Sequence, residues 1–138
     1  MPPPSNHPSL YLQVQPGSFF VIKLPSDEGI PPWVLEELAS TKSFFSVTRT
    51  TEEISIVGES HETIPEHSKE FSTWTCIKIM GPMEHDLTGI MASFTAPLKE
   101  AKVPIIAMST WNTDYILVPT KQVTSATAVL KSDGWTFV

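Results

Sequence analysis

The sequence has little of what several common sites and structures require. Its single cysteine, Cys76, excludes an internal disulfide and a cysteine-based zinc site. It has 9 Lys+Arg against 15 Asp+Glu, which argues against nucleic acid and anionic membrane partners because these select clustered cations. No apolar run approaches the roughly 20 residues of a membrane span. The start has no cationic region followed by an apolar stretch, so no signal peptide and a cytoplasmic location are expected.

Charged residues are also scarce. They make up 17% of the 138 residues, below the roughly 25% of typical globular domains. A small protein with so few surface charges is expected to cover part of its surface with a second copy, so we predict a homodimer. The length itself predicts one domain or two very small ones, with enough chain to bury a core.

No catalytic constellation is present in the sequence. The four histidines include no i,i+4 pair, so a metal site would need ligands from unrelated loops. There is no G-x-S-x-G motif and no glycine-rich phosphate loop, and Cys76 lies between apolar neighbours, as a buried, inert thiol does. The sequence therefore favours a protein that is not an enzyme and that holds no metal or cofactor.

The first half of the chain contains short β-rich runs and one helix. Residues 1–8 hold four prolines and predict a disordered arm, and the polar, aperiodic residues 58–72 predict a loop. The expected strands are 10–15, 19–24, 44–50 and 54–57, and the expected helix, opened by two prolines, is 33–38.

The second half predicts a complete β-α-β-β-α-β unit. Its expected strands are 74–79, 104–110, 115–118 and 135–138. Two helices are indicated by apolar positions at helical spacing: Leu87, Ile90, Met91, Phe94, Leu98 and Ala101 in one, Val123, Ala126, Thr127 and Leu130 in the other. Asp86 is the expected N-cap of the first helix, and Pro97 is expected to bend it. This order is the ferredoxin-like arrangement, with both helices on one face of an antiparallel sheet.

An internal repeat suggests that the first half is a shortened copy of the second. Residues 21–24 match 76–79 at an offset of 55 (76 − 21), and residues 46–57 match 107–118 at an offset of 61 (107 − 46). The sequence therefore predicts an α+β protein of tandem ferredoxin-like units, the first degenerate, with boundaries at 9–72 and 73–138.

Two segments could carry a binding site. The loop 81–90 leads into the N-terminus of a helix, which offers free amides to a carboxylate, and Gly89 would permit close approach. Equally, it could be a capped helix whose glycine serves packing. Residues 111–114 need only be a hairpin turn, or Asp114 could pair with an ammonium or guanidinium. The hairpin need not lie near the loop of its own unit and could meet it across an interface.

The same residues resemble a known family. SVTRTTEEISIV, LTGI followed by APL, and STWNTDYILV are similar to the ACT domain family, in the subgroup named for CASTOR-type arginine sensors. The resemblance implies tandem ferredoxin-like regulatory units that hold an amino acid or similar zwitterion between paired units. Because the sensors are about twice this length, it implies a homodimer here, with a regulatory protein as a possible partner.

The resemblance also implies which residues touch the ligand. They are Asp86, Leu87, Thr88, Gly89 and Ile90 of the loop, Thr110, Trp111, Asn112, Thr113 and Asp114 of the hairpin, and Val103, Pro104 and Ile105 of the strand edge. Asp114 is the expected acceptor for a cationic group. Pro104 offers no amide hydrogen and Trp111 is bulkier than the usual aromatic, so a ligand-free ACT scaffold for protein–protein contact stays as the alternative.

Overall fold

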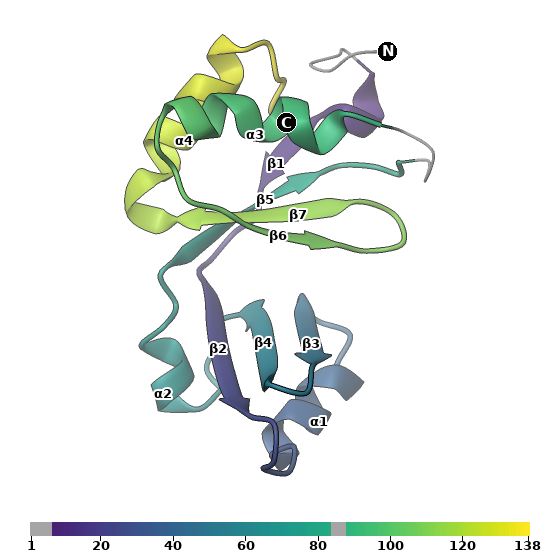
Figure 1. Ribbon diagram of the computed structural model, residues 1–138, viewed down its shortest axis with the longest axis vertical. Helices are drawn as coiled ribbons and strands as arrows, with labels where there is room; N and C mark the ends of the chain where they lie inside the picture. Colours follow the sequence, from purple (N-terminus) through teal and green to yellow (C-terminus); the bar gives the residue numbers. More distant parts are fainter. Residues whose placement is uncertain (1–6, 84–87) are drawn as a thin grey trace. The chain divides into compact units, whose positions relative to one another are not determined.

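The computed structural model describes residues 7–83 and 88–138, and these form two compact units (Figure 1). The N-terminal unit comprises residues 17–74. The C-terminal unit combines residues 7–16 with residues 75–138. Each unit has its own cluster of buried apolar side chains.

The C-terminal unit is a sheet with strand order β1-β5-β7-β6 and two helices. β1 pairs antiparallel with β5, and β6 pairs antiparallel with β7. Its elements are a 3₁₀ turn (Pro8–Leu10), β1 (Leu12–Val14), β5 (Trp74–Ile79), α3 (Ile90–Glu100), β6 (Ile106–Ser109), β7 (Asp114–Pro119), a second 3₁₀ turn (Thr120–Gln122) and α4 (Val123–Ser132). Both predicted helices are thus present, and Pro97 lies inside α3.

The core of this unit lies on one face of the sheet. Ile77 and Ile79 of β5 and Ile116 and Val118 of β7 share that face because strand side chains alternate. They pack against the apolar stripes of α3 and α4, which are Ile90, Phe94, Leu98, Ala126 and Leu130. Both helices therefore cover the same side of the sheet, as predicted and as Figure 1 shows.

The predicted last strand is replaced by a strand from the start of the chain. Of residues 135–138, only Phe137 forms a β-bridge, parallel to Leu12. β1 lies between this segment and β5: the Leu12 N–H donates to the Thr136 carbonyl at 2.8 Å, and the Val138 N–H donates to the Leu12 carbonyl at 2.8 Å. Residues 9–16, which the sequence placed in the first unit, thus belong to the sheet of the C-terminal unit. Of the expected disordered arm, residues 1–6 lie outside the described residues, and Pro8 opens a 3₁₀ turn.

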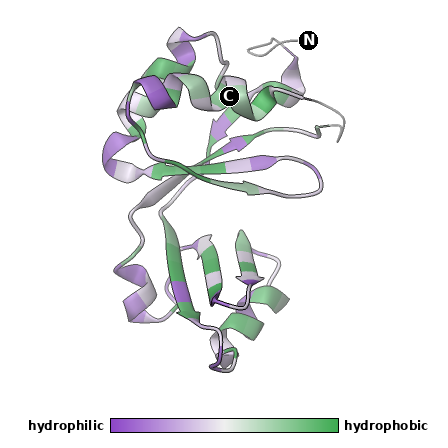
Figure 2. Ribbon diagram, viewed as in Figure 1, coloured by the Kyte–Doolittle hydropathy of each residue, from purple (hydrophilic) through white to green (hydrophobic). Residues whose placement is uncertain are grey.

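The N-terminal unit is a smaller sheet with strand order β3-β4-β2. Its elements are β2 (Phe19–Pro25), α1 (Pro32–Ala39), β3 (Phe45–Arg49), β4 (Glu53–Glu59) and α2 (Glu66–Lys69). Val34 of α1 is fully buried against Phe20, Ile22, Ile54 and Ile56, and Figure 2 shows the hydrophobic residues along β2 and α1. The predicted loop 58–72 is wrong in part, because it contains the end of β4 and the whole of α2.

The strand register shows that the two halves align one residue differently from the alignment that the sequence repeat suggested. Both hairpins close on the same turn: the Thr50 N–H donates to Glu53 O at 2.9 Å, and the Thr110 N–H donates to Thr113 O at 2.8 Å. The structural offset is therefore 60 (110 − 50), whereas the matching letters gave 61. A one-residue shift exchanges the two faces of a strand. The sequence alignment at offset 61 therefore equates Ile56, a core residue, with Leu117, whose side chain lies on the face of β7 opposite to the core.

We predict that β1 is essential to the C-terminal unit. Leu12 is fully buried in its core, so Leu12→Ala should reduce the free energy of unfolding by about 2–5 kcal/mol. Val14 lies on the same strand but is 39% exposed, so Val14→Ala should cost less than about 1 kcal/mol. Urea denaturation of the two variants measures the difference, and equal small losses would show that β1 is not part of the core.

Candidate functional site

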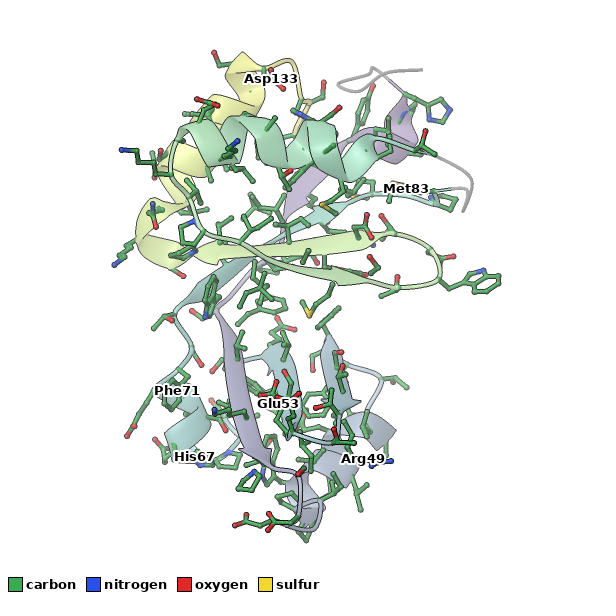
Figure 3. The ribbon with its side chains drawn as sticks, in the orientation of Figure 1. Arg49, Glu53, His67, Phe71, Met83 and Asp133 are labelled. Carbon is green, nitrogen blue, oxygen red and sulfur yellow. The ribbon has the colours of Figure 1, made fainter. Side chains whose placement is uncertain are left out.

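The β6–β7 hairpin lies directly against the loop that follows β5. β7 is the hydrogen-bonded neighbour of β5, so the tip of the hairpin comes to the end of β5. The Thr113 hydroxyl donates to the carbonyl of Ile79, and the Met83 N–H donates to the carbonyl of Asn112 at 2.7 Å. Figure 3 shows Met83, the last described residue before the gap, beyond the end of β5. Two segments that the sequence singled out separately are therefore joined within one unit.

Gly81 is required at this junction. Its φ is +65°, and a Cβ there would lie 2.9 Å from the Thr113 Cβ and 3.1 Å from the Asn112 carbonyl oxygen. The Gly81 N–H also donates to the carbonyl of Ser9 at 2.8 Å, so the N-terminal segment holds the loop from its other side. Only glycine combines this conformation with so close an approach.

The start of α3 is exposed and open. Its N-cap is Gly89, with φ +77°, rather than the predicted Asp86, and no side-chain hydrogen bond caps the helix within the described part of the chain. Thr88 and Gly89 are exposed, and nothing lies within 4 Å of where a Gly89 Cβ would be. The first amides of a helix have no partner within the helix, so those of α3 could accept a ligand. Ile90 is only 5% exposed and packs into the core.

Two of the predicted loop residues, Asp86 and Leu87, lie outside the described residues. The loop is therefore represented by Thr88, Gly89 and Ile90, of which the first two are accessible to a ligand.

The hairpin separates its five predicted residues into accessible and structural positions. Trp111 is 80% exposed at the tip, and Thr110 and Asn112 are exposed beside it. Thr113 is only 4% exposed, because its hydroxyl is committed to β5. Asp114 is half-buried at the start of β7.

Asp114 has a hydroxyl partner that the sequence analysis did not identify. The Ser109 hydroxyl donates to Asp114 Oδ1 at 2.6 Å, and the two residues are directly opposite across the β6–β7 ladder. The hydrogen bond orients the carboxylate while leaving acceptor positions on its oxygens. A hairpin register drawn from the turn would have identified Ser109.

The predicted strand-edge residues lie away from the loop and the hairpin tip. Ile106 pairs with Leu117 at one end of β6, and Ser109 pairs with Asp114 at the other end, roughly 10 Å along the strand. Val103, Pro104 and Ile105 precede Ile106, so they lie at the far end from the turn. Val103 is buried and its N–H donates to Leu98 O at 2.9 Å, whereas Pro104 is exposed. Within one C-terminal unit, these residues do not join the loop and the hairpin.

The chemistry offered by this end of the unit is that of a small binding site. It has the helix start at Gly89 and, on the β6–β7 hairpin, the Asp114 carboxylate oriented by Ser109. In residues 7–83 and 88–138, no group of three or more His, Cys, Asp and Glu side chains is arranged to hold a metal ion. The helices in these ranges are all too short or too polar to cross a membrane.

We predict that the junction is sensitive to a methyl group at Gly81 and not at Gly89. Both glycines have positive φ, so alanine adds backbone strain of roughly 1 kcal/mol at either position. Gly81→Ala additionally forces a clash with Thr113 and should cost about 1–3 kcal/mol more. The difference in melting temperature between the two variants measures the cost of the clash with Thr113. Equal melting temperatures would contradict the prediction.

Family models match parts of both halves of the chain. Residues 72–132 match the family model of the ACT domain, and residues 17–67 match a second family model, which is described as an N-terminal domain. A search of curated proteins found no match.

Solved structures share the fold over nearly the whole chain. An X-ray structure of a protein from Agobacterium tumefaciens is 31% identical, with a TM-score of 0.77, and the match covers 93% of this chain and 91% of that one. A Vibrio cholerae protein of unknown function, titled a possible transport protein, is 17% identical, with a TM-score of 0.64 and 91% coverage of each chain. The aspartokinase alpha and beta subunit structure is 13% identical, with a TM-score of 0.64, 89% coverage of this chain and 96% of that one.

These matches agree with the β-α-β-β-α order and one-sided helices of the C-terminal unit. Residues 72–132 are thus similar to the ACT domain family in sequence and in fold.

Proposed function

We propose that this protein is a non-enzymatic regulatory sensor that binds an amino acid or a similar small zwitterion. The observation that carries the proposal is the junction in the C-terminal unit, where the exposed, left-handed Gly89 opens α3 and the hairpin bearing Asp114 lies against the loop from β5. ACT domains are regulatory modules that generally bind amino acids, which supports assigning this end of the unit to a ligand.

The two groups have complementary chemistry toward a zwitterion. The free amides and partial positive charge at the start of α3 suit the α-carboxylate. The Asp114 carboxylate, oriented by Ser109, suits an ammonium or guanidinium, with a charge-assisted hydrogen bond. The side chain of Trp111, exposed at the hairpin tip, would cover the ligand.

The remaining predicted contacts would come from a second copy. Val103, Pro104 and Ile105 lie at the far end of β6, so a homodimer is needed to bring this edge to the ligand, as in the CASTOR-type arrangement. We also infer that the N-terminal unit is a degenerate ACT unit, because its β-α-β-β-α order repeats that of the C-terminal unit. Ligand binding would favour one packing of the two copies, which a regulatory partner then recognises.

A ligand-free scaffold is the second candidate function. It is favoured by one observation, the 80% exposure of Trp111, because exposed tryptophans are frequent anchors of protein–protein contacts. Without a ligand, the same hairpin would serve as a docking element for another protein.

A thermal-shift screen against free amino acids separates the two functions. A ligand at 100 times its dissociation constant should add about 2.7 kcal/mol of stability, or roughly 5–10 °C in melting temperature for a chain of this size. The scaffold predicts no shift with any amino acid.

Asp114→Asn tests the site itself. The amide oxygen still accepts the Ser109 hydrogen bond, so the melting temperature of the ligand-free protein should change little. Because the negative charge is gone, a basic amino acid should lose most of its effect on the melting temperature. Asp133→Asn, an exposed position at the end of α4, is the matched control and should keep the full shift. A full shift in Asp114→Asn would remove this residue from the site.

A further inference from the structure

The N-terminal unit has a groove of its own, away from any residue discussed above as a ligand contact. It has a volume of about 420 Å³ and is open to solvent on the side of β2 that carries α2. Its lining residues are Val21, Ile22, Lys23, Glu53, Ser55, His67 and Phe71. All of them belong to residues 17–74, so the groove lies within one unit.

Two opposite charges lie on the floor of this groove without neutralising each other. In the β2–β4 ladder, Lys23 is opposite Ser55, so Glu53 is its diagonal neighbour on the same face. Diagonal neighbours have Cβ atoms roughly 7–8 Å apart. Neither the Lys23 nor the Glu53 side chain forms an ion pair or hydrogen bond with another residue that the structure describes. Both charged groups thus have hydrogen-bonding positions to offer a ligand.

The wall of the groove supplies an apolar surface and a second polar group. His67 lies in α2, Phe71 lies in the turn that follows it, and both line the groove; Figure 3 labels them together with Glu53. Phe71 is 53% exposed, so its ring can offer an apolar surface to a ligand in the groove. Val21 adds a half-buried apolar side chain next to Lys23.

We propose that this groove is a second binding site, for a small zwitterion that carries an aromatic or large apolar side chain. The ligand carboxylate pairs with Lys23, with His67 beside it, and the ligand ammonium pairs with Glu53. An amino acid carries its carboxylate and its ammonium on one carbon, so the two diagonal neighbours would hold both groups by charge-assisted hydrogen bonds. The apolar side chain packs on Phe71, because binding sites combine apolar walls with a few convergent polar groups.

The larger groove in the same unit does not fit such a ligand. Its volume is about 720 Å³, and every residue that lines it is polar or charged. One of its carboxylates, that of Glu37, is already paired with His61 at 2.9 Å. No apolar residue lines it, so Lys42 and Glu62, which do line it, provide matched controls for the charges of the smaller groove.

The test uses the full-length, isotope-labelled protein and follows each backbone amide by NMR. The probe is L-phenylalanine, with phenethylamine and 3-phenylpropanoate as analogues that keep only the cation or only the anion. We expect L-phenylalanine to shift the amides of residues 21–23, 53–55 and 67–71 saturably at millimolar concentration. Each analogue should bind at least about tenfold more weakly, because one charge-assisted hydrogen bond is lost.

Variants assign the binding to the two charges. Lys23→Gln and Glu53→Gln should each weaken L-phenylalanine binding about tenfold, while Lys42→Gln and Glu62→Gln should leave it unchanged. No saturable shift in these amides, equal binding of the analogues, or unchanged affinity in Lys23→Gln would each overturn the proposal. The amides of Thr88, Gly89 and Asp114 report separately on the site proposed for the C-terminal unit, so failure at one groove is distinguishable from failure at the other.

Discussion

The contact between the β6–β7 hairpin and the end of β5 is the constraint on which the candidate site depends. The buried Thr113 hydroxyl reaches the Ile79 carbonyl, and Gly81 approaches Thr113 so closely that no side chain fits between them. Together they fix where the chain leaves β5 toward α3. Because Asp114 follows Thr113 directly, the same contact sets the distance between the carboxylate and the loop. The ferredoxin-like strand order allows this contact, since it places β7 next to β5.

The sequence predicted most helices and strands, but not which strands pair with each other. The helical spacing of Ile90, Phe94 and Leu98 identified α3, and α4 was found in the same way. The runs 10–15 and 135–138 both look like strands, and local pattern cannot tell which of them pairs with β5. The structure gives that position to β1 because Leu12 then completes the core. α2 was missed because four residues are too few for a helical period to appear.

The internal repeat shows why sequence similarity is weaker evidence for equivalent residues than strand register. Along β7, Ile116, Leu117 and Val118 are all buried, so the alternation that normally distinguishes the faces of a strand is lost. A match shifted by one residue then looks as good as the correct one. The turn contacts of the two hairpins, which are independent of side-chain type, resolve the shift.

The sequence indicated three segments for the candidate site, and the structure brings two of them, the loop and the hairpin, together within one unit. Motif resemblance identified the loop, the hairpin and the strand edge, but the topology of one unit places Val103, Pro104 and Ile105 at the opposite end of β6 from Asp114. In the proposed function, a ligand that touches all three segments joins two copies. In that case ligand binding and dimerisation are linked by mass action, and the apparent affinity rises with protein concentration. A sensor built in this way responds to its own abundance as well as to its ligand, whereas a site complete within one unit does not.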